Sequence, residues 1–439
     1  MRLRNTLLLL AILAAGFAIT VGRFATETPT EAQAARYAEH NATAYTLPPP
    51  QLQRAIVLNR TRRTLAIADL LWTLALLLLV LVTGSAARIS DLATSLSKNR
   101  WAQCFSFVFL LLLVIHLLNL PLGIYAHWVA RSYGLSVQGW GSWLTDKTKS
   151  FALEWFIGGL LSMLIFWVVG KSPTRWWFWF WIPAMLFLIS GVFVTPYVID
   201  PLFNKFEPLA QSNPALVQRL EQVVARGGIF IPPERMFLMK ASAKSTELNA
   251  YVTGFGASKR IVVWDTTIAK ATPDEISFIF AHEMGHYALG HVVAGVVLSC
   301  IGLLPFFWIG YHTVRLLLAR FGTAWRIPSQ QDWGALVVLL LVLFTLSTLS
   351  DPIANAFSRT IEHHADVYGE EAIHGIVAHS QATAQQAFQL LGEDSLDDPT
   401  PHPLYELWFG THPAIRVRAA FAEAYDPWAA GQSPKYFAK

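Results

Sequence analysis

The stretch AHEMGHYALGHVVAGVVLSCIGLLPFFWIG, residues 281–310, opens with two histidines and a glutamate and continues into an apolar run. His282 and His286 are four residues apart, so on a helix both imidazoles project from one face. Glu283 is rotated about 100° around the same helix, from where its carboxylate can reach a water on a metal ion without binding the ion. The stretch therefore predicts a metal site directly beside a membrane-spanning helix.

The composition of the whole chain supports a membrane protein. Of its 439 residues, 54% are hydrophobic and 14% are charged, and the mean hydropathy is +0.41. Soluble proteins carry about 25% charged residues. The net charge of +4 is small for this length, and we find no basic run with interleaved aromatic residues, so we expect no nucleic-acid partner. The two cysteines, Cys104 and Cys300, exclude a disulfide framework and a cysteine-based zinc finger.

Seven apolar runs are long enough, or nearly so, to cross a bilayer, which needs about 20 residues. They are 7–21, 65–85, 105–124, 151–170, 176–198, 292–310 and 334–351. The first run could instead be a signal peptide, because Arg2 and Arg4 precede it and small residues follow. Since six further runs follow it, we favour an uncleaved first helix.

Two segments are too polar to cross a membrane, 199–291 and 358–439. Neither suggests a complete core alone, so we expect them to fold together as one hydrophilic domain. The predicted organisation is a five-span N-terminal region at 1–198, a first domain segment at 199–291, a two-span hairpin at 292–357 and a second domain segment at 358–439.

Local signals within the first polar segment predict individual elements. Asn213, Pro214 and the pair Gly227-Gly228 bracket an amphipathic helix, and Thr272 to Glu275 form a capping box with proline at the first helical position. We expect strands at 236–240, 248–255 and 260–264, the last two joined as a hairpin by residues 256–259. We predict that 248–255 is an exposed edge strand, to which an extended peptide could add.

The third metal ligand is less clearly marked. Glu362 and Asp366, in the run SRTIEHHAD at 358–366, are four residues apart and follow the seventh apolar run directly. On a helix, Glu362 would bind the metal while Asp366 hydrogen-bonds a ligand histidine. An isolated pair of this kind is usually a solvated helix face. The metzincin spacing fails at His291, which lies nine residues after His282 and so on the opposite side of a continuous helix. His363, His364, His402 and His412 remain alternatives.

The chain resembles the type I CAAX prenyl proteases, which are seven-span membrane zinc peptidases. Five motifs carry the resemblance, in the order expected for that family. They are IDPLFNKFEPL at 199–209, STELNAYVTGFGASKRIVVWDT at 245–266, HEMGHYALGH at 282–291, NAFSRTIEHHAD at 355–366 and THPAIRVR at 411–418. The N-terminal spans match mainly in number and length.

The resemblance implies a role for each matching residue. His282, His286 and Glu362 would bind one zinc ion, and Glu283 would be the general base. Asp366 would orient a ligand histidine, and His412 would stabilise the oxyanion. Arg418 would support the site, while Asn249 and Ala250 lie where the family's edge strand receives the substrate backbone.

We therefore expect a mainly α fold: a seven-helix integral membrane protein with a small α+β zincin-like hydrophilic catalytic domain assembled from two segments. The expected function is zinc-dependent endopeptidase activity on a peptide or protein substrate by metal-activated water. The protein would be a multi-pass membrane protein in the lipid bilayer, in the cell membrane if the chain is bacterial. The alternative is a transporter or channel with a structural zinc site, for which His116 and Glu154, in or near spans, would be the functional groups.

Overall fold

The computed structural model describes residues 44–254 and 259–437, so the predicted run at 7–21 and most of the predicted turn at 256–259 lie outside the described residues. Within the described part, six helical segments are long and apolar enough to cross a membrane. They are α3 (Pro49–Val82), α5 (Arg100–Ser132), α6 (Trp140–Lys171), α7 (Trp176–Val194) with its continuation, α13 (His291–Trp325) and α14 (Ala335–Ile373). These six correspond to the second through seventh predicted runs.

Several of these helices are much longer than the apolar runs that predicted them. α14 has 39 residues and passes Pro352 without ending, so at about 1.5 Å per residue it extends roughly 58 Å. The hydrocarbon core of a bilayer is only about 30 Å thick. One continuous helix therefore carries the chain from the membrane into the polar part, and the predicted domain boundary between residues 357 and 358 falls inside it.

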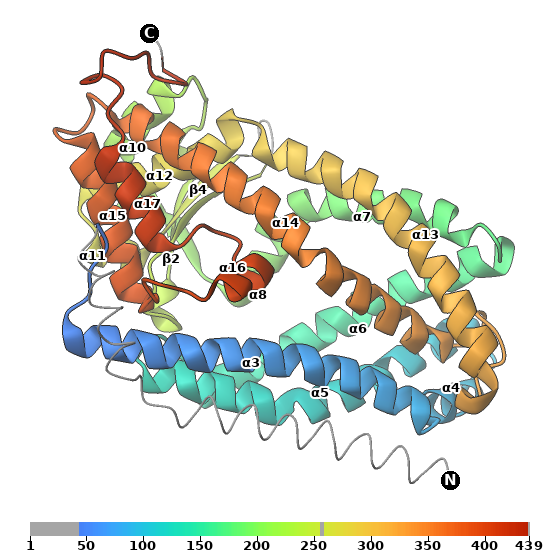
Figure 1. Cartoon of the computed structure of the whole chain (residues 1–439). Helices are drawn as coiled ribbons and strands as arrows, with labels where there is room; N and C mark the ends of the chain where they lie inside the picture. The colour runs from blue at the N-terminus through green and yellow to red at the C-terminus, as the bar shows by residue number, and fades with distance from the viewer. Residues whose placement is uncertain (1–43, 255–258, 438–439) are drawn as a thin grey trace.

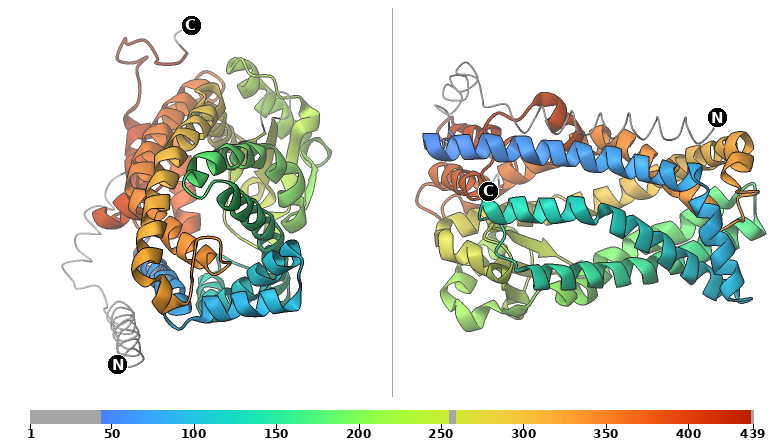
Figure 2. Two further views of the ribbon diagram at one scale, coloured as in Figure 1. Left: turned by 90° about the vertical axis from the view of Figure 1, so that its right-hand side faces the viewer. Right: turned by 90° about the horizontal axis from the view of Figure 1, so that it is seen from below.

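The membrane part contains three shorter elements besides the long helices. α4 (Ser85–Leu96) follows α3, and α7 continues through a π-helical turn at Thr195–Ile199 into α8 (Asp200–Phe203). Figure 1 and the two views of Figure 2 show the long helices running away from the sheet, with α4 at the far end. Two ionisable residues of this part lie together, because His116 Nε2 of α5 is 3.4 Å from Glu154 Oε2 of α6.

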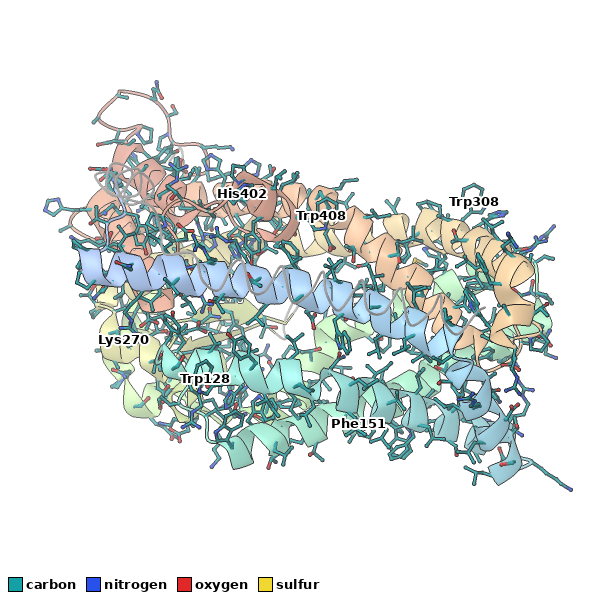
Figure 3. The ribbon with its side chains drawn as sticks, turned by 60° about the horizontal axis from the view of Figure 1, so that its bottom comes forward. Trp128, Phe151, Lys270, Trp308, His402 and Trp408 are labelled. Carbon is teal, nitrogen blue, oxygen red and sulfur yellow. The ribbon has the colours of Figure 1, made fainter. Side chains whose placement is uncertain are left out.

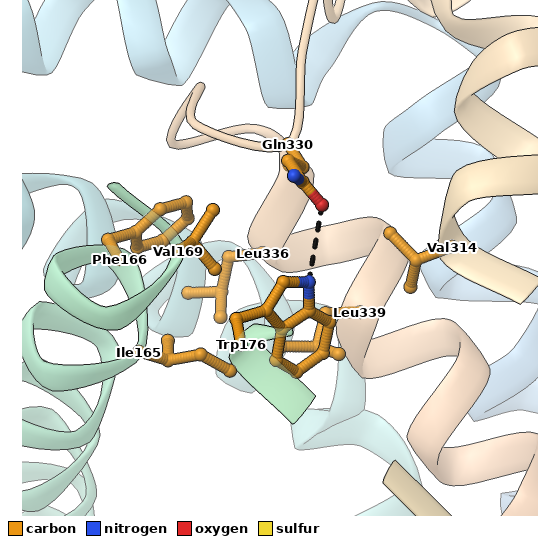
Figure 4. Close-up of a pocket in the computed structure, with 9 residues that line it drawn as sticks. Ile165, Phe166, Val169, Trp176, Val314, Gln330, Leu336 and Leu339 are labelled. Atoms are coloured by element: carbon orange, nitrogen blue, oxygen red, sulfur yellow. Dashed lines mark hydrogen bonds between the residues drawn. The ribbon is translucent and has the colours of Figure 1, made fainter. Parts of the chain in front are cut away.

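Apolar side chains of several long helices pack together at the far end of the bundle. A cavity there has a volume of about 20 Å³ and is lined mainly by apolar side chains of α6, α13 and α14 (Figure 4). Trp176 Nε1 donates to Gln330 Oε1 at 3.2 Å across it. Space for about one water molecule is too small for a peptide, so this cavity is no candidate for a substrate site.

The polar part contains a four-stranded sheet with the order β1-β2-β4-β3. The strands are β1 (Phe206–Pro208), β2 (Met236–Met239), β3 (Ala250–Thr253) and β4 (Arg260–Trp264). β2 and β4 are parallel, whereas β1 and β3 pair antiparallel at the two edges. The prediction that the strand around Ala250 lies at an edge is confirmed, although it is shorter than 248–255. β1 was not predicted.

Helices from both polar segments surround this sheet. The first segment supplies α9 (Leu209–Ser212), α10 (Pro214–Arg226), α11 (Asp265–Lys270) and α12 (Pro273–Ala288), with short 3₁₀ turns at Pro233–Arg235 and Ala241–Ala243. The second supplies the end of α14 with α15 (Ser380–Ser395), α16 (Pro403–Phe409) and α17 (Ile415–Ala424). The predicted helix starting at Pro214 is confirmed.

The two polar segments share one hydrophobic core. Phe278 of α12 and Phe388 of α15 are each 1% exposed and meet edge to face, with ring centroids 5.1 Å apart. Edge-to-face contact between buried rings is a favourable aromatic geometry. The same buried cluster includes Tyr45, whose hydroxyl donates to the carbonyl of Asp397 at 3.1 Å. Residues more than 100 positions apart in sequence are therefore packed around the helix that carries HEMGH.

Candidate metal centre

α12 begins as the sequence predicts. The Thr272 side chain accepts from the backbone of Glu275 and the Glu275 carboxylate accepts from the backbone of Thr272, and Pro273 occupies the first helical position. These contacts satisfy amide groups that a helix N-terminus leaves without partners. The next residues, Ile276 to Ala281, are buried in the shared core. Burial of this turn fixes the rotation of the helix, and so the direction in which the two histidines project.

α12 and α14 approach each other closely because a glycine lies at each contact. A Cβ atom on Gly369 of α14 would lie 2.9 Å from the backbone nitrogen of His282, and one on Gly285 of α12 would lie 3.0 Å from the ring of Tyr368. The first distance is shorter than real Cβ contacts and its neighbour is backbone, so a larger residue at 369 would push the helices apart, whereas at 285 the Tyr368 side chain would have to shift. This close packing brings Glu362 and Asp366, about two turns and one turn before Gly369, against the histidines of α12.

Three potential metal-binding atoms converge between these helices. His282 Nε2 is 3.3 Å from His286 Nε2 and 3.3 Å from Glu362 Oε2, and His286 Nε2 is 3.5 Å from Glu362 Oε1. The edge of a tetrahedron around zinc, with bonds of about 2.0–2.1 Å, is about 3.4 Å. Glu362 Oε2 is buried and accepts no hydrogen bond from any described residue. The two imidazole nitrogens and the Glu362 carboxylate therefore have the spacing and the unsatisfied acceptor that a metal ion requires.

Asp366 holds His282 from the side opposite to this point of convergence. Its carboxylate Oδ1 lies 2.8 Å from His282 Nδ1, and the residue is 1% exposed. Burial alone would lower the pKa of His282, but the carboxylates of Asp366 and Glu362 raise it to about 9. A hydrogen bond from Nδ1 to Asp366 leaves Nε2 of His282 facing Glu362 and His286.

Arg418 of α17 compensates the charge of the buried Asp366. Its Nε lies 3.0 Å from Asp366 Oδ2 and its Nη2 lies 2.6 Å from Oδ1, a two-point pairing. Its guanidinium also packs over the ring of Phe388, 4.6 Å from the centroid. Nη2 is 3.6 Å from Glu362 Oε2 as well. The second polar segment thus contributes to the site from two helices, α14 and α17. The arginine on α17 is the one that the sequence resemblance indicated.

His291 lies next to His286, contrary to the sequence-based expectation. α12 ends at Ala288, and Gly290 adopts φ = +69°, a left-handed conformation that glycine reaches without strain. This break redirects the chain, and His291 Nδ1 lies 3.2 Å from His286 Nδ1. The argument that His291 points to the opposite side was wrong because it assumed one unbroken helix. His291 is still not among the three converging atoms, since it contacts the other ring nitrogen of His286.

The other candidate histidines have different positions. The ring of His363 packs on Phe421 of α17, with centroids 4.7 Å apart, and His402 Nδ1 accepts from the backbone of Leu404 at the start of α16. His364 contributes no atom to the converging group in the described part of the chain. His412 does reach it, with Nε2 3.4 Å from Glu362 Oε2 and a side chain that is 57% exposed.

Glu283 lies beside the converging atoms on α12. Burial raises the pKa of its carboxyl group, and the neighbouring Glu362 carboxylate acts in the same direction. A carboxylate with a raised pKa is a stronger proton acceptor near neutral pH than one in water.

β3 borders this site, and among the described residues no strand pairs with its outer edge. The amide of Trp264 donates to the carbonyl of Asn249, and Ala250 is opposite Val263 in the antiparallel register. Because hydrogen-bonded pairs alternate along such a ladder, the backbone groups of Ala250 and Val252 face the free edge. The backbone of Asn249 is already satisfied, since its amide donates to the Thr267 hydroxyl and its carbonyl accepts from the same group.

Comparisons with known proteins agree with this arrangement. The model of peptidase family M48 matches residues 210–426, and the model of the CAAX prenyl protease N-terminal region, five membrane helices, matches residues 36–205. An uncharacterized metalloprotease, YhfN, of Bacillus subtilis is 34% identical over 352 residues, covering 79% of this chain and 80% of the relative. CAAX prenyl protease 1 of Saccharomyces cerevisiae is 29% identical over 334 residues, covering 72% and 71%.

A solved structure shows the same fold. The crystal structure of S. mikatae Ste24p superposes with a TM-score of 0.75 at 24% identity, covering 95% of this chain and 98% of that chain. The chain is therefore a multi-pass membrane metalloendopeptidase that belongs to peptidase family M48.

Proposed function

We propose that this protein binds one zinc ion through His282, His286 and Glu362 and cleaves peptide bonds of peptide or protein substrates. The observation that carries the proposal is the near-equal separation of the two imidazole nitrogens from each other and from the Glu362 carboxylate oxygens, 3.3, 3.3 and 3.5 Å. Two imidazoles and one carboxylate are a ligand set typical of hydrolytic zinc sites that leave one position open. When bound there, zinc supplies a Lewis acid and lowers the pKa of a water molecule.

In this proposal Glu283 accepts the proton of the attacking water and passes it to the leaving amine. The raised pKa of its carboxyl group suits that task. Asp366 keeps the proton of His282 on Nδ1, and Arg418 keeps Asp366 ionised by pairing with both of its oxygens. Arg418 thus acts on the site through Asp366 and does not need to touch the substrate.

His412 is proposed to stabilise the negative charge that develops on the carbonyl oxygen. Its Nδ1 is 2.9 Å from the Thr411 hydroxyl. If that hydroxyl donates to Nδ1, the ring proton resides on Nε2, which faces Glu362 and the proposed reaction centre. A donor aimed at the oxyanion contributes about 10²–10³-fold in rate.

The substrate is proposed to bind as an additional strand along β3. The outward-facing backbone groups of Ala250 and Val252 would pair with the substrate backbone, and the side chain of Asn249 lies at the start of this edge. Main-chain pairing gives affinity that depends little on sequence. Several relatives are named CAAX prenyl proteases, and for this chain we propose a peptide substrate without specifying a prenyl group.

The finer architecture belongs to the same proposal. We propose that residues 7–21 form a seventh span, that 1–198 and 292–357 are the membrane regions, and that 199–291 and 358–439 form one α+β zincin-like domain. We further propose a cell-membrane location, if the chain is bacterial, and no nucleic-acid partner. The shared core of the two polar segments supports the single domain.

The test compares the purified wild-type protein with Glu283→Gln, with peptides analysed by mass spectrometry after incubation in detergent or vesicles. Wild type should produce zinc-dependent cleavage within peptides, and the variant should produce none while retaining its metal. A transporter with a structural zinc site predicts no cleavage by either protein. His116 and Glu154, the ionisable residues considered for that alternative, pair with each other.

A further inference from the structure

α14 carries two polar side chains on the same face as Glu362 that the proposed chemistry does not use. Asn355 and Arg359 precede Glu362 by seven and three residues, so all three lie on one face of the helix, together with Asp366. Both residues lie at the membrane side of the metal centre. A polar face continued this far into a membrane helix requires partners for its donors.

Those partners are carbonyl groups at the end of α16. Arg359 Nη1 donates to the carbonyl of Glu406 at 3.0 Å and to that of Gly410 at 2.7 Å, and Asn355 Nδ2 donates to the carbonyl of Trp408 at 2.6 Å. Figure 3 labels His402 and Trp408 near the two ends of this short helix. The carbonyl of Glu406 also accepts from the amide of Gly410. The last carbonyls of a helix otherwise lack partners within it and attract positive charge. Arg359 and Asn355 therefore fasten the C-terminal end of α16 to α14.

The C-terminal end of α16 is followed within three residues by His412. Gly410 is followed by Thr411 and His412, whose Nε2 lies 3.4 Å from Glu362 Oε2. Past the histidine, the amide of Ala414 donates to Glu406 Oε1 at 3.4 Å, so Glu406 closes the loop between α16 and α17. The side chain of His412 is 57% exposed, so its packing alone does not fix its position.

We propose that Arg359, assisted by Asn355, is a positioning residue that sets the height of His412 over the metal centre. The inference rests on the proposed function of His412 as oxyanion donor. Glu362 and Arg359 are less than one helical turn apart on α14. The helix therefore fixes the position of the loop that carries His412 relative to Glu362. Displacing a catalytic group by about 1 Å can cost about 10²-fold in rate.

The test is a double-mutant cycle with Arg359→Gln, His412→Ala and the double variant, measured as full-length protein in detergent with a peptide substrate. Arg359→Gln should lower kcat about 10- to 10²-fold with little change in KM. In the His412→Ala background the same change should have little further effect, because the group that Arg359 positions is already absent. Zinc content should stay stoichiometric in all three variants.

Arg62→Gln is the matched control. Arg62 donates to the carbonyl of Ser395 at the end of α15, the same kind of contact, and its second partner is the partly exposed Glu247, which is not one of the converging residues. It should leave kcat near that of wild type. Asn355→Ala removes a single neutral donor, so it should give a smaller fall in kcat and remains usable if Arg359→Gln does not fold.

A second measurement does not depend on activity. In the metal-free protein, hydrogen exchange of residues 404–414 should be faster in Arg359→Gln than in wild type, while exchange of residues 362–373 should be unchanged. Equal losses from Arg359→Gln in both backgrounds, or unaltered exchange at 404–414, would overturn the inference. Normal kcat in His412→Ala would instead refute the proposed role of His412, whatever Arg359→Gln does to exchange.

Discussion

The Nδ1 atom of His291 lies 3.2 Å from the Nδ1 atom of His286. The Nε2 atom of His286 faces Glu362. In the proposed site this atom binds the metal through its lone pair, which places the ring proton on Nδ1. His291 is the group that can accept this proton in a hydrogen bond. Both proposed ligand histidines then have a hydrogen-bond partner at Nδ1, His282 the carboxylate of Asp366 and His286 the imidazole of His291.

His291→Ala should therefore weaken zinc binding without abolishing it. Loss of a partner that orients a ligand histidine typically costs about 10- to 100-fold in metal affinity. The measurement is competition for zinc with a chromogenic chelator. His363→Ala, which removes an exposed histidine packed on Phe421, is the control and should bind zinc as tightly as wild type. Unchanged affinity in His291→Ala would show that His286 needs no such partner.

Glu362→Ala should lose stoichiometric zinc. The two remaining imidazoles would leave the metal with two protein ligands, fewer than the three of known catalytic zinc sites. Zinc per protein, measured by atomic emission after dialysis, is the readout, with His363→Ala again as the neighbour on the same helix. Full occupancy in Glu362→Ala would remove Glu362 from the ligand set and leave Asp366 or His412 to be examined in its place.

The sequence predicted well which side chains converge, because a helix converts fixed spacings into fixed faces. His282, His286 and the pair Glu362 and Asp366 each lie within two turns of one helix, where the period of 3.6 residues accumulates little error. No local sequence pattern predicted that α12 and α14 pack so closely. It depends on Gly285 and Gly369, whose importance is visible only when the partner helix is in place.

The same reasoning failed at His291 because a helix boundary lies between it and His286. Leu289-Gly290 is a recognisable C-terminal signal for a helix, since Gly290 supplies the left-handed residue, and it would have ended α12 before His291. The hydrogen bonds from Arg359 and Asn355 to the end of α16 could not be predicted from the sequence either. Its acceptors are main-chain carbonyls, which leave no trace in a sequence.

Glu283→Gln should keep zinc at wild-type stoichiometry while losing turnover. The amide has nearly the shape of the carboxylate but cannot accept a proton, and general base catalysis contributes about 10²–10⁴-fold. Cleavage of a fluorogenic peptide and zinc content should be measured on the same preparation. Near wild-type cleavage by the variant would mean that another group takes the proton.

Zinc binding to the metal-free protein should depend on pH through His282. The pKa of this group is raised to about 9 by the carboxylates of Asp366 and Glu362, against 6.5 for the model group. Below pH 9 a zinc ion must therefore displace a proton, and affinity should fall about tenfold per pH unit as pH falls. In Asp366→Asn the bend in the affinity profile should move to lower pH. A profile flat between pH 7 and 9 in wild type would contradict this.

The stability of the metal-free protein should change with pH in the opposite direction to its zinc affinity. Because the folded-state pKa of His282 lies above its unfolded value, this group stabilises the metal-free protein fully below about pH 6.5. The contribution is lost as pH rises through about 9. The thermal midpoint of metal-free wild type should thus decline across this window more than that of Asp366→Asn, which lacks the hydrogen-bonded carboxylate.

Val252→Pro should weaken substrate binding while leaving the metal centre intact. The ladder between β3 and β4 uses the backbone groups of Asn249 and its alternate neighbours, so the amide of Val252 faces the free edge. Proline lacks that amide hydrogen, and edge strands tolerate proline where the amide faces outward. If a substrate strand pairs there, losing one hydrogen bond should lower kcat/KM by about 2- to 10-fold, mainly through KM.

The control for this experiment is Tyr251→Pro, one residue earlier. Tyr251 is opposite Val262, in a hydrogen-bonded position of the ladder, so proline there removes a contact within the sheet. It should lower the thermal midpoint, whereas Val252→Pro should not. A peptide substrate carrying a single N-methyl group should lose affinity for wild type at one position along its length. If Val252→Pro and wild type have the same KM for every peptide tested, the free edge of β3 does not receive the substrate backbone.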